Sequence, residues 1–367
     1  MSSGSDGLST LFGTELRKIR ARERFLQDGE RPSGLVSEPI IQSWERCLSR
    51  GRSMHEFVVP TLLPKHALKH TLRRSRRILD AAEPDLLKLD AALTHTGCSV
   101  SLLDPAGVVI HASSGHSISG DLARQWCRVG VDLSEQAIGT SAPGIVMQSG
   151  CAAQVDCAEH YFAGHASMRC AAAPVLDWHG GFAGLLNIAV ESRTFGFDAK
   201  EVVTMHAASI EHRLLRMQPA GYWLIEFHIA TDMIGSGSAG LAGVRPDGRV
   251  AWINGVGARL LGVSRAPNRD VESMFGLTFD VLSRHDETML HRLPNGLTVC
   301  LSISGSPAHG SMQTHIAVSR DDRLADQHHR LILETLAAHD GNISRAARRL
   351  GVSRGTIYRA MGMSASR

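Results

Sequence analysis

Residues 341–361 read GNISRAARRLGVSRGTIYRAM, and this stretch specifies two short helices joined by a tight turn. Asn342 is placed to cap the first helix, and Gly351 stands where a left-handed residue ends it. Ser353 is placed to cap the second helix, and apolar residues on either side of that cap form a hydrophobic staple that fixes the entry angle. The pattern therefore predicts a helix-turn-helix.

The exposed residues of the predicted second helix have the chemistry needed to read DNA. In a helix-turn-helix this helix enters the major groove, and its first residues face the base edges. The predicted base-reading residues are Arg354, Gly355, Thr356, Tyr358 and Arg359, and Ser353, the cap of this helix, is counted with them as DNA-binding. The predicted phosphate contacts, which position the module without reading sequence, are Arg345, Arg348 and Arg349 on the first helix. The alternative for this segment is an ordinary surface hairpin with a solvated basic face.

Charge is distributed unevenly along the chain, although the formal net charge is only +3. Residues 341–367 contain six arginines and no acidic residue. The first 80 or so residues are also net positive, whereas the long middle of the chain is net negative. Because Lys and Arg gain affinity for a polyanion by releasing its counterions, the basic end favours a nucleic-acid partner.

Upstream, the hydrophobic pattern predicts helices followed by two units of mixed sheet and helix. Apolar residues repeat at helical spacing from Glu38 to near Gly51, and further helices are predicted over 14–27 and 64–80. In the first unit, strands are predicted over 98–112 around a turn at 105–107, and over 152–155, 170–175 and 182–190. A helix capped by Asp198 follows and runs to Met217. In the second unit, turns at 247–248 and 294–296 separate short strands.

Two sets of residues resemble known regulators. Residues 342–358 resemble the C-terminal helix-turn-helix of Fis-type regulators, in which the run N-x-S/T-x-A-A-x-x-L-G-V/I-S/N-R-x-T-L/I-Y is typical. Four upstream segments look like the N-terminal and GAF regions of acetoin-catabolism-type regulators: 37–51 (SEPIIQSWERCLSRG), 132–144 (DLSEQAIGTSAPG), 158–161 (AEHY) and 170–190 (CAAAPVLDWHGGFAGLLNIAV). Residues 243–264 (GVRPDGRVAWINGVGARLLGVS) are similar to a degenerate PAS domain.

The resemblance implies an α+β fold with tandem sensor domains and an all-α DNA-binding end. The expected boundaries are a flexible or helical N-terminal arm at 1–34, a helical lead-in at 35–82, a GAF-like domain at 83–217, a linker at 218–237, a PAS-like domain at 238–322 and a Fis-type helix-turn-helix at 323–367.

One departure from the family concerns ATP. Most members carry a central ATPase that remodels sigma-54 polymerase, and its phosphate-binding loop reads G-x-x-x-x-G-K-S/T. No such run occurs in residues 1–367, where the only lysines after residue 70 are Lys88 and Lys200, and neither follows a glycine. We therefore expect DNA binding without ATP hydrolysis, with RNA polymerase recruited or blocked. Motifs typical of hydrolases and dehydrogenases are also missing from the sequence, so we expect no enzyme activity.

A GAF-like domain is expected to hold an effector between its sheet and the covering helices, in a largely apolar pocket with a few polar groups. The candidate effector-binding residues are Trp126, Glu135, Thr140, His160 and Cys170. The alternative is that these residues only pack the core or shape turns.

A second hypothesis concerns the run Cys157-x2-His160-x4-His165-x4-Cys170, which has the donor atoms of a zinc or iron site at irregular spacing. On this alternative the protein is a redox, gas, metal or haem sensor, whereas the leading interpretation needs no cofactor and no metal. A third hypothesis is a scaffold or enzyme whose basic tail binds RNA or an anionic surface.

The sequence also predicts a compartment and an assembly. The cysteines are odd in number and scattered, no secretion signal is visible, and no apolar stretch approaches the ~20 residues that span a bilayer. We expect a cytoplasmic protein with no membrane partner. The leading hypothesis is a one-component transcription regulator, a homodimer in which a small-molecule effector shifts how the recognition helices meet a palindromic double-stranded operator.

Overall fold

The fold is described from a computed structural model of the chain. The structure describes residues 4–32, 34–113, 118, 120–217, 221–265, 268–278, 280–281 and 288–304. The predicted helix-turn-helix at 323–367, with all nine candidate DNA-binding residues, lies outside the described residues.

The chain begins with helices, as the periodicity predicts. Their bounds are α1 (Gly4–Asp28), α2 (Glu38–Ser49), α3 (Lys65–Arg74) and α4 (Arg76–Leu93). The helix predicted over 64–80 is instead two helices that meet at Ser75, and the second continues through Pro84. It continues because Leu86, Leu89 and Leu93 extend its apolar stripe against the first sheet.

The first sheet has five antiparallel strands in the order β2-β1-β5-β4-β3. The strands are β1 (Ser99–Leu103), β2 (Val109–Ala112), β3 (Ala153–Asp156), β4 (Met168–Leu176) and β5 (Phe182–Glu191). The predicted turn at 105–107 joins β1 to β2, and a turn at 177–181 joins β4 to β5. In each turn an aspartate side chain, Asp104 or Asp177, accepts two backbone N–H groups.

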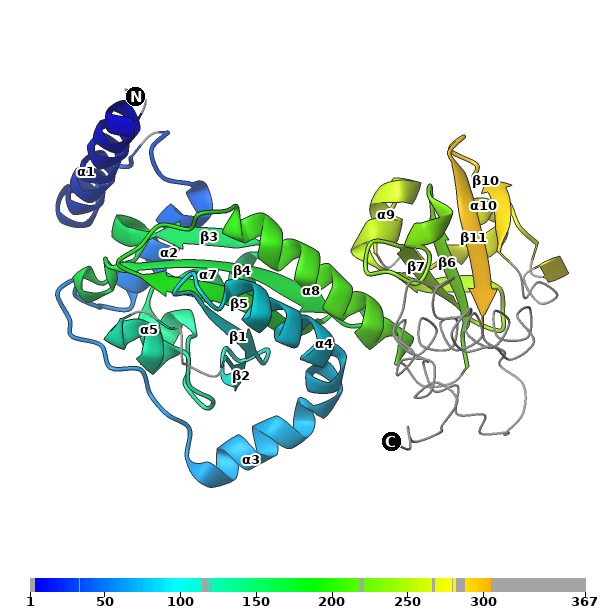
Figure 1. The fold of residues 1–367 in the computed structure, drawn as a ribbon, viewed down its shortest axis with the longest axis horizontal. Helices are drawn as coiled ribbons and strands as arrows, with labels where there is room; N and C mark the ends of the chain where they lie inside the picture. Colours follow the sequence, from blue (N-terminus) through cyan, green and yellow to red (C-terminus); the bar gives the residue numbers. More distant parts are fainter. Residues whose placement is uncertain are drawn as a thin grey trace, which may run out of the picture. The chain divides into compact units, whose positions relative to one another are not determined.

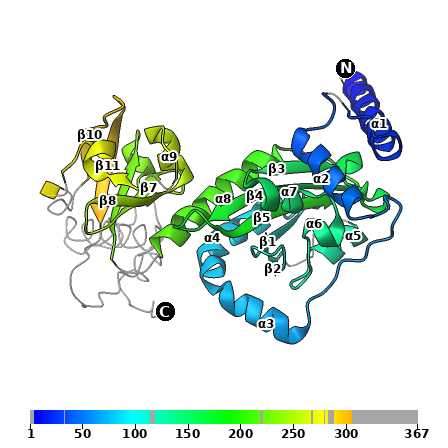
Figure 2. The same ribbon diagram turned by 180° about the vertical axis from the view of Figure 1, so that it is seen from behind.

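Both faces of this sheet are covered, as Figures 1 and 2 show from opposite sides. Leu186 and Ile188 of β5 pack on the side of α4 and α8 (Ala199–Arg216), whereas Leu185 and Ala189 face the other side. That other side is covered by α2, α5 (Asp121–Trp126), α6 (Glu135–Ile138), α7 (Ala142–Ser149) and the turns η1 (Cys157–Glu159) and η2 (Ala163–His165). The candidate effector residues all lie on this side of the sheet, Cys170 on β4 itself and the other four in the covering layer.

A second antiparallel sheet has six strands in the order β10-β11-β6-β7-β8-β9. Its elements are β6 (Trp223–His228), η3 (Thr231–Met233), β7 (Gly240–Val244), β8 (Arg249–Ile253), α9 (Gly255–Leu261), β9 (Arg269–Asp270), α10 (Val271–Phe275), β10 (Met289–Arg292) and β11 (Thr298–Ser304). The range 218–237, predicted as a linker, contains strand β6, which pairs with both β7 and β11. The side chains of Ile225 and Phe227, two residues apart, point into the core of this sheet. This strand pattern is too short to stand out beside the nearby glycines and serines.

Within the residues that the structure describes, no helix combines the length and the apolar character needed to cross a bilayer.

Candidate functional site

The structure brings the five candidate effector residues to one side of the first sheet. They come from separate elements: Trp126 ends α5, Glu135 begins α6, Thr140 precedes α7, His160 follows η1 and Cys170 lies on β4. None is more than 4% exposed. A ligand that contacts them must therefore enter the core, because their side chains do not reach the surface.

Three of these residues and His165 form one cluster of rings and a thiol. The Nδ1 atom of His160 lies 3.1 Å from the carbonyl oxygen of Cys157, and its Nε2 atom lies 3.5 Å from Sγ of Cys170. The indole of Trp126 meets the imidazole of His165 edge to face, with ring centroids 5.0 Å apart, and the ring of His160 at 6.1 Å. We call Trp126, His160, His165 and Cys170 the ring cluster.

Burial keeps the ring cluster uncharged. It lowers the pKa of His160 to about 3 and that of His165 to about 4, and it raises the pKa of Cys170 to about 12. At neutral pH both imidazoles are therefore neutral and the thiol keeps its proton. The cluster offers hydrogen bonds without a net charge.

Two polar atoms of the ring cluster are left without a partner. Among the described residues, neither Nε1 of Trp126 nor Nδ1 of His165 has a well-oriented hydrogen bond, although both atoms are buried and backbone groups of Ile138 and Val58 lie beside the His165 ring. An unsatisfied buried polar group costs about 1–3 kcal/mol, and such groups are rare in native proteins. A small polar molecule held between these rings would supply the missing partners.

Glu135 and Thr140 belong to a different, charged cluster. Ser43 Oγ donates to Glu135 at 2.6 Å, Arg46 donates twice at 2.8 and 2.7 Å, and Arg50 donates at 3.0 Å. Thr140 Oγ1 lies 2.8 Å from Ser43 Oγ. Burial alone would raise the pKa of Glu135, but the hydrogen bonds from Arg46, Ser43 and Arg50 hold it below its ordinary value. In this structure Glu135 fastens α2 to the first sheet domain.

We expect Glu135→Gln to lower the free energy of unfolding by about 2 kcal/mol, because two arginines lose their shared carboxylate. The cost is less than for a fully buried pair, since the side chains of Arg46 and Arg50 remain about a third exposed and can be solvated. The matched control is Glu45→Gln on the same helix, where Arg31 and Glu45 form an exposed pair and the loss should stay below about 0.5 kcal/mol. Urea unfolding, followed by tryptophan fluorescence, measures the free energy of unfolding of both variants. Equal losses would contradict the role assigned to Glu135 in holding α2.

The first helix contacts the segment that carries His160. Lys18 Nζ lies 2.7 Å from Glu159 Oε1, and Arg22 Nη1 donates to the carbonyl oxygen of His160 at 3.1 Å. Trp44 of α2 donates its Nε1–H to the carbonyl oxygen of Glu159 at 2.8 Å. These contacts could not be predicted from the sequence, since helical periodicity carries no information about pairing across more than a hundred residues.

The four residues proposed for a metal site do not fit one. Structural and catalytic metal sites need at least three donors on one ion. Of the four, His160 and Cys170 are in side-chain contact, and the described part of the chain contains no group of three His, Cys, Asp or Glu placed to hold a metal. Burial also raises the pKa of Cys157 to about 11, so its thiol keeps its proton at neutral pH.

Comparison with known proteins identifies a family at the C-terminal end of the chain and several similar regulators. Residues 323–362 match the family described as bacterial regulatory protein, Fis family. The chain is 25% identical over 226 residues to the acetoin catabolism regulatory protein of Cupriavidus necator, an alignment that covers 60% of this chain and 34% of that protein. It is 28% identical over 171 residues to the acetoin dehydrogenase operon transcriptional activator AcoR of Bacillus subtilis, covering 46% of this chain and 28% of that protein.

Among solved structures, the chain is similar to one from the E. coli DhaR(N)–DhaL complex, at 15% identity and a TM-score of 0.45, covering 74% of this chain and all of that one.

The chain spans about a third of the length of the two curated relatives. The Fis-type helix-turn-helix predicted at the C-terminal end is confirmed, and the homologues are acetoin-catabolism regulators.

Proposed function

We propose that this protein is an effector-responsive transcription regulator that binds double-stranded DNA through its Fis-type helix-turn-helix. One observation carries the proposal. Residues 323–362 match the Fis family, and the arginine-rich run within this segment has no acidic residue after position 340. Similarity to two named regulators supports it. On this proposal residues 83–217 form a GAF-like sensor, and the PAS-like domain at 238–322 is extended by β6.

The proposed mechanism is a shift between two placements of the recognition helices in a cytoplasmic homodimer. Half-sites of a palindromic operator lie about one helical turn of DNA apart, ~34 Å, so only one placement matches them. An effector that binds that placement more tightly increases its population. Because residues 1–367 contain no phosphate-binding loop, we propose that the regulator recruits or blocks RNA polymerase without hydrolysing ATP.

For the effector we propose a small uncharged polar molecule in the ring cluster. The neutral imidazoles and the two unpartnered nitrogens, Trp126 Nε1 and His165 Nδ1, support a ligand with hydroxyl or carbonyl oxygens. A charged ligand would lose its hydration without gaining a counter-ion from these four side chains. Acetoin, named in the descriptions of both relatives, is an uncharged hydroxyketone of this class.

We expect Trp126→Phe to weaken acetoin binding about five- to tenfold, because phenylalanine keeps an aromatic ring but lacks the Nε1–H donor, and one hydrogen bond contributes about 1 kcal/mol. Trp178→Phe is the matched control, since Trp178 stacks with Arg77 outside the ring cluster. Isothermal titration calorimetry measures the affinities. Equal affinities of the two variants, or no binding of acetoin at all, would contradict the proposed effector site.

The DNA-binding proposal is tested separately by fluorescence anisotropy with promoter fragments. The full chain should bind a subset of fragments specifically. A chain that lacks residues 341–367 should keep its fold and lose this binding, whereas specific binding by the shortened chain would overturn the proposal.

A further inference from the structure

Helix α3 carries a row of exposed cations. Lys65, Lys69 and Arg73 recur every four residues, so their side chains leave nearly the same face of the helix at steps of about 6 Å along its axis. All three side chains are exposed. Within the described part of the chain, none of them has an ion pair or a hydrogen bond. We call these three residues the α3 row.

No acidic residue nearby in the sequence offsets the charge of the α3 row. Residues 57–79 contain six lysines and arginines and neither aspartate nor glutamate. The arginines that follow the row already have partners, since Arg74 pairs with Asp104 at 3.0 Å. Arg76 pairs with Asp80, also at 3.0 Å. Like charges four residues apart destabilise a helix by about 0.2–0.5 kcal/mol per pair, so the α3 row costs stability while it has no partner.

Contacts on another side of α3 hold the helix against the first sheet domain. Leu68 lies over Gly130, and Thr71 is buried. Just before the helix, the backbone N–H of Leu63 donates to the carbonyl oxygen of Gly130 at 2.9 Å. Figure 1 shows α3 at the edge of this domain, with α4 continuing from it into the fold. The α3 row is therefore presented to solvent by a helix whose position is fixed.

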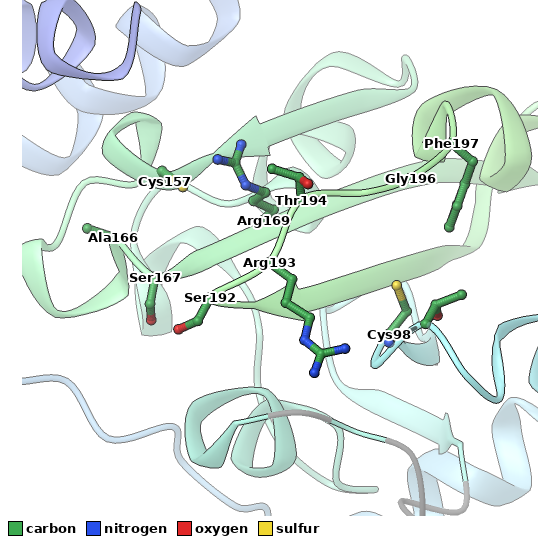
Figure 3. Close-up of a pocket in the computed structure, with 11 residues that line it drawn as sticks. Cys98, Cys157, Ala166, Ser167, Arg169, Ser192, Arg193, Thr194, Gly196 and Phe197 are labelled. Carbon is green, nitrogen blue, oxygen red and sulfur yellow. Dashed lines mark hydrogen bonds between the residues drawn. The ribbon is translucent and has the colours of Figure 1, made fainter. Parts of the chain in front are cut away.

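A pocket where β4 begins and β5 ends also contains two arginines, Arg169 and Arg193 (Figure 3). Their side chains point to opposite sides of segment 192–197 in the figure. Arg169 is also paired with Glu15 and with Asp156, at 3.6 Å in each case. The α3 row differs from this pair because its three members are unpaired neighbours on one helix, so that one extended anion can meet all of them.

The charge spacing of duplex DNA suits the α3 row. Duplex DNA carries one negative charge about every 1.7 Å of its axis, and the row spans about 12 Å, so each cation can meet a phosphate. Proteins that bind single strands add tryptophan, tyrosine or phenylalanine side chains on which bases stack. Helix α3 contains none of these residues. The backbone of a duplex therefore fits the row better than a single strand does.

We propose that the α3 row contacts the phosphate backbone of the DNA that this chain binds. The contact reads no base sequence and adds affinity by releasing counterions from the DNA. The proposal rests on the proposed DNA binding, but it concerns a different surface and predicts a salt dependence instead of a sequence preference. DNA is favoured over an acidic partner protein because the Fis-family match at 323–362 already implies a DNA partner.

The test measures binding of the full chain to a long duplex of mixed sequence by fluorescence anisotropy, over a series of salt concentrations. Lys65→Gln, Lys69→Gln and Arg73→Gln are combined in one variant. This variant should bind the duplex about tenfold more weakly, or weaker still, at low salt. It should also lower the slope of log affinity against log salt concentration by about 2–3, since each phosphate contact on B-DNA contributes about 0.9.

The matched control combines Lys88→Gln, Arg193→Gln and Lys200→Gln. It removes the same charge from three exposed residues that lie on α4, after β5 and on α8. Its slope should stay close to that of the unchanged chain, and thermal melting checks that both variants are folded.

Three results would overturn the proposal. Equal losses in the two triple variants would show general charge attraction, and an unchanged slope in the α3 variant would leave the row to an acidic protein or to solvent. Absence of any duplex binding by the full chain at low salt would also overturn it. Failure of the sequence-specific regulator function alone gives a different result, because the full chain then binds all duplexes equally while the α3 variant still lowers the slope.

Discussion

Replacing Arg354 and Arg359 together by alanine is expected to weaken binding to operator DNA about 100-fold. Both residues lie in the predicted recognition helix, and each contact with a base edge contributes about 1–3 kcal/mol of discrimination. Binding to unrelated DNA should fall much less, because that binding depends mainly on total charge. Fluorescence anisotropy with operator and scrambled duplexes measures the ratio of the two affinities.

The control for this experiment is Arg348→Ala on the preceding helix. Arg348 is predicted to contact a phosphate, so its loss should weaken binding to operator and scrambled DNA by similar factors. It should also lower the slope of log affinity against log salt concentration by about one. If the double variant also lowered both affinities equally, the assignment of base-reading residues to the second helix would be wrong.

Acidification from pH 7 to 5 is expected to lower the free energy of unfolding by about 3–4 kcal/mol through His160 and His165 alone. Their folded pKa values, about 3 and about 4, lie below the unfolded value of 6.5. The unfolded chain therefore binds more protons than the folded chain in this range. The stabilisation is fully present above about pH 6.5 and is lost as the pH falls towards the folded values. Urea unfolding at a series of pH values measures the slope of the free energy of unfolding against pH.

The variants His160→Gln and His165→Gln should each remove about half of this slope, whatever they do to stability at pH 7. The matched control is His179→Gln, because His179 is exposed in the turn between β4 and β5. A slope that the two core variants leave unchanged would show that these histidines are solvated in the folded protein, and the proposed neutral effector site would lose its basis.

The parts of the fold that could be predicted from sequence are those fixed by neighbouring residues. The turns at Asp104 and Asp177 were predictable because the aspartate side chain binds backbone N–H groups two to four residues further on. The start of α8 was predictable for the same reason, since Asp198 accepts the backbone N–H of Glu201. The C-terminal helix-turn-helix combines caps, a glycine and charge within some twenty residues.

The parts that could not be predicted depend on contacts between distant residues. Glu135 was expected in an effector pocket, but the structure places its carboxylate on Arg46 and Arg50, more than eighty residues away in sequence. Strand β6 escaped prediction because two inward-facing residues, Ile225 and Phe227, are too few to stand out beside a stretch rich in glycine and serine.

We propose that this chain recognises a DNA sequence through its C-terminal helix-turn-helix. The most direct test is selection from a random pool of double-stranded DNA by the full chain, without nucleotide, followed by sequencing. We expect enrichment of one palindrome whose half-sites lie about one helical turn apart. Recovery of no common sequence, with equal affinity for every duplex and for RNA, would contradict it and assign the basic end to unspecific polyanion binding.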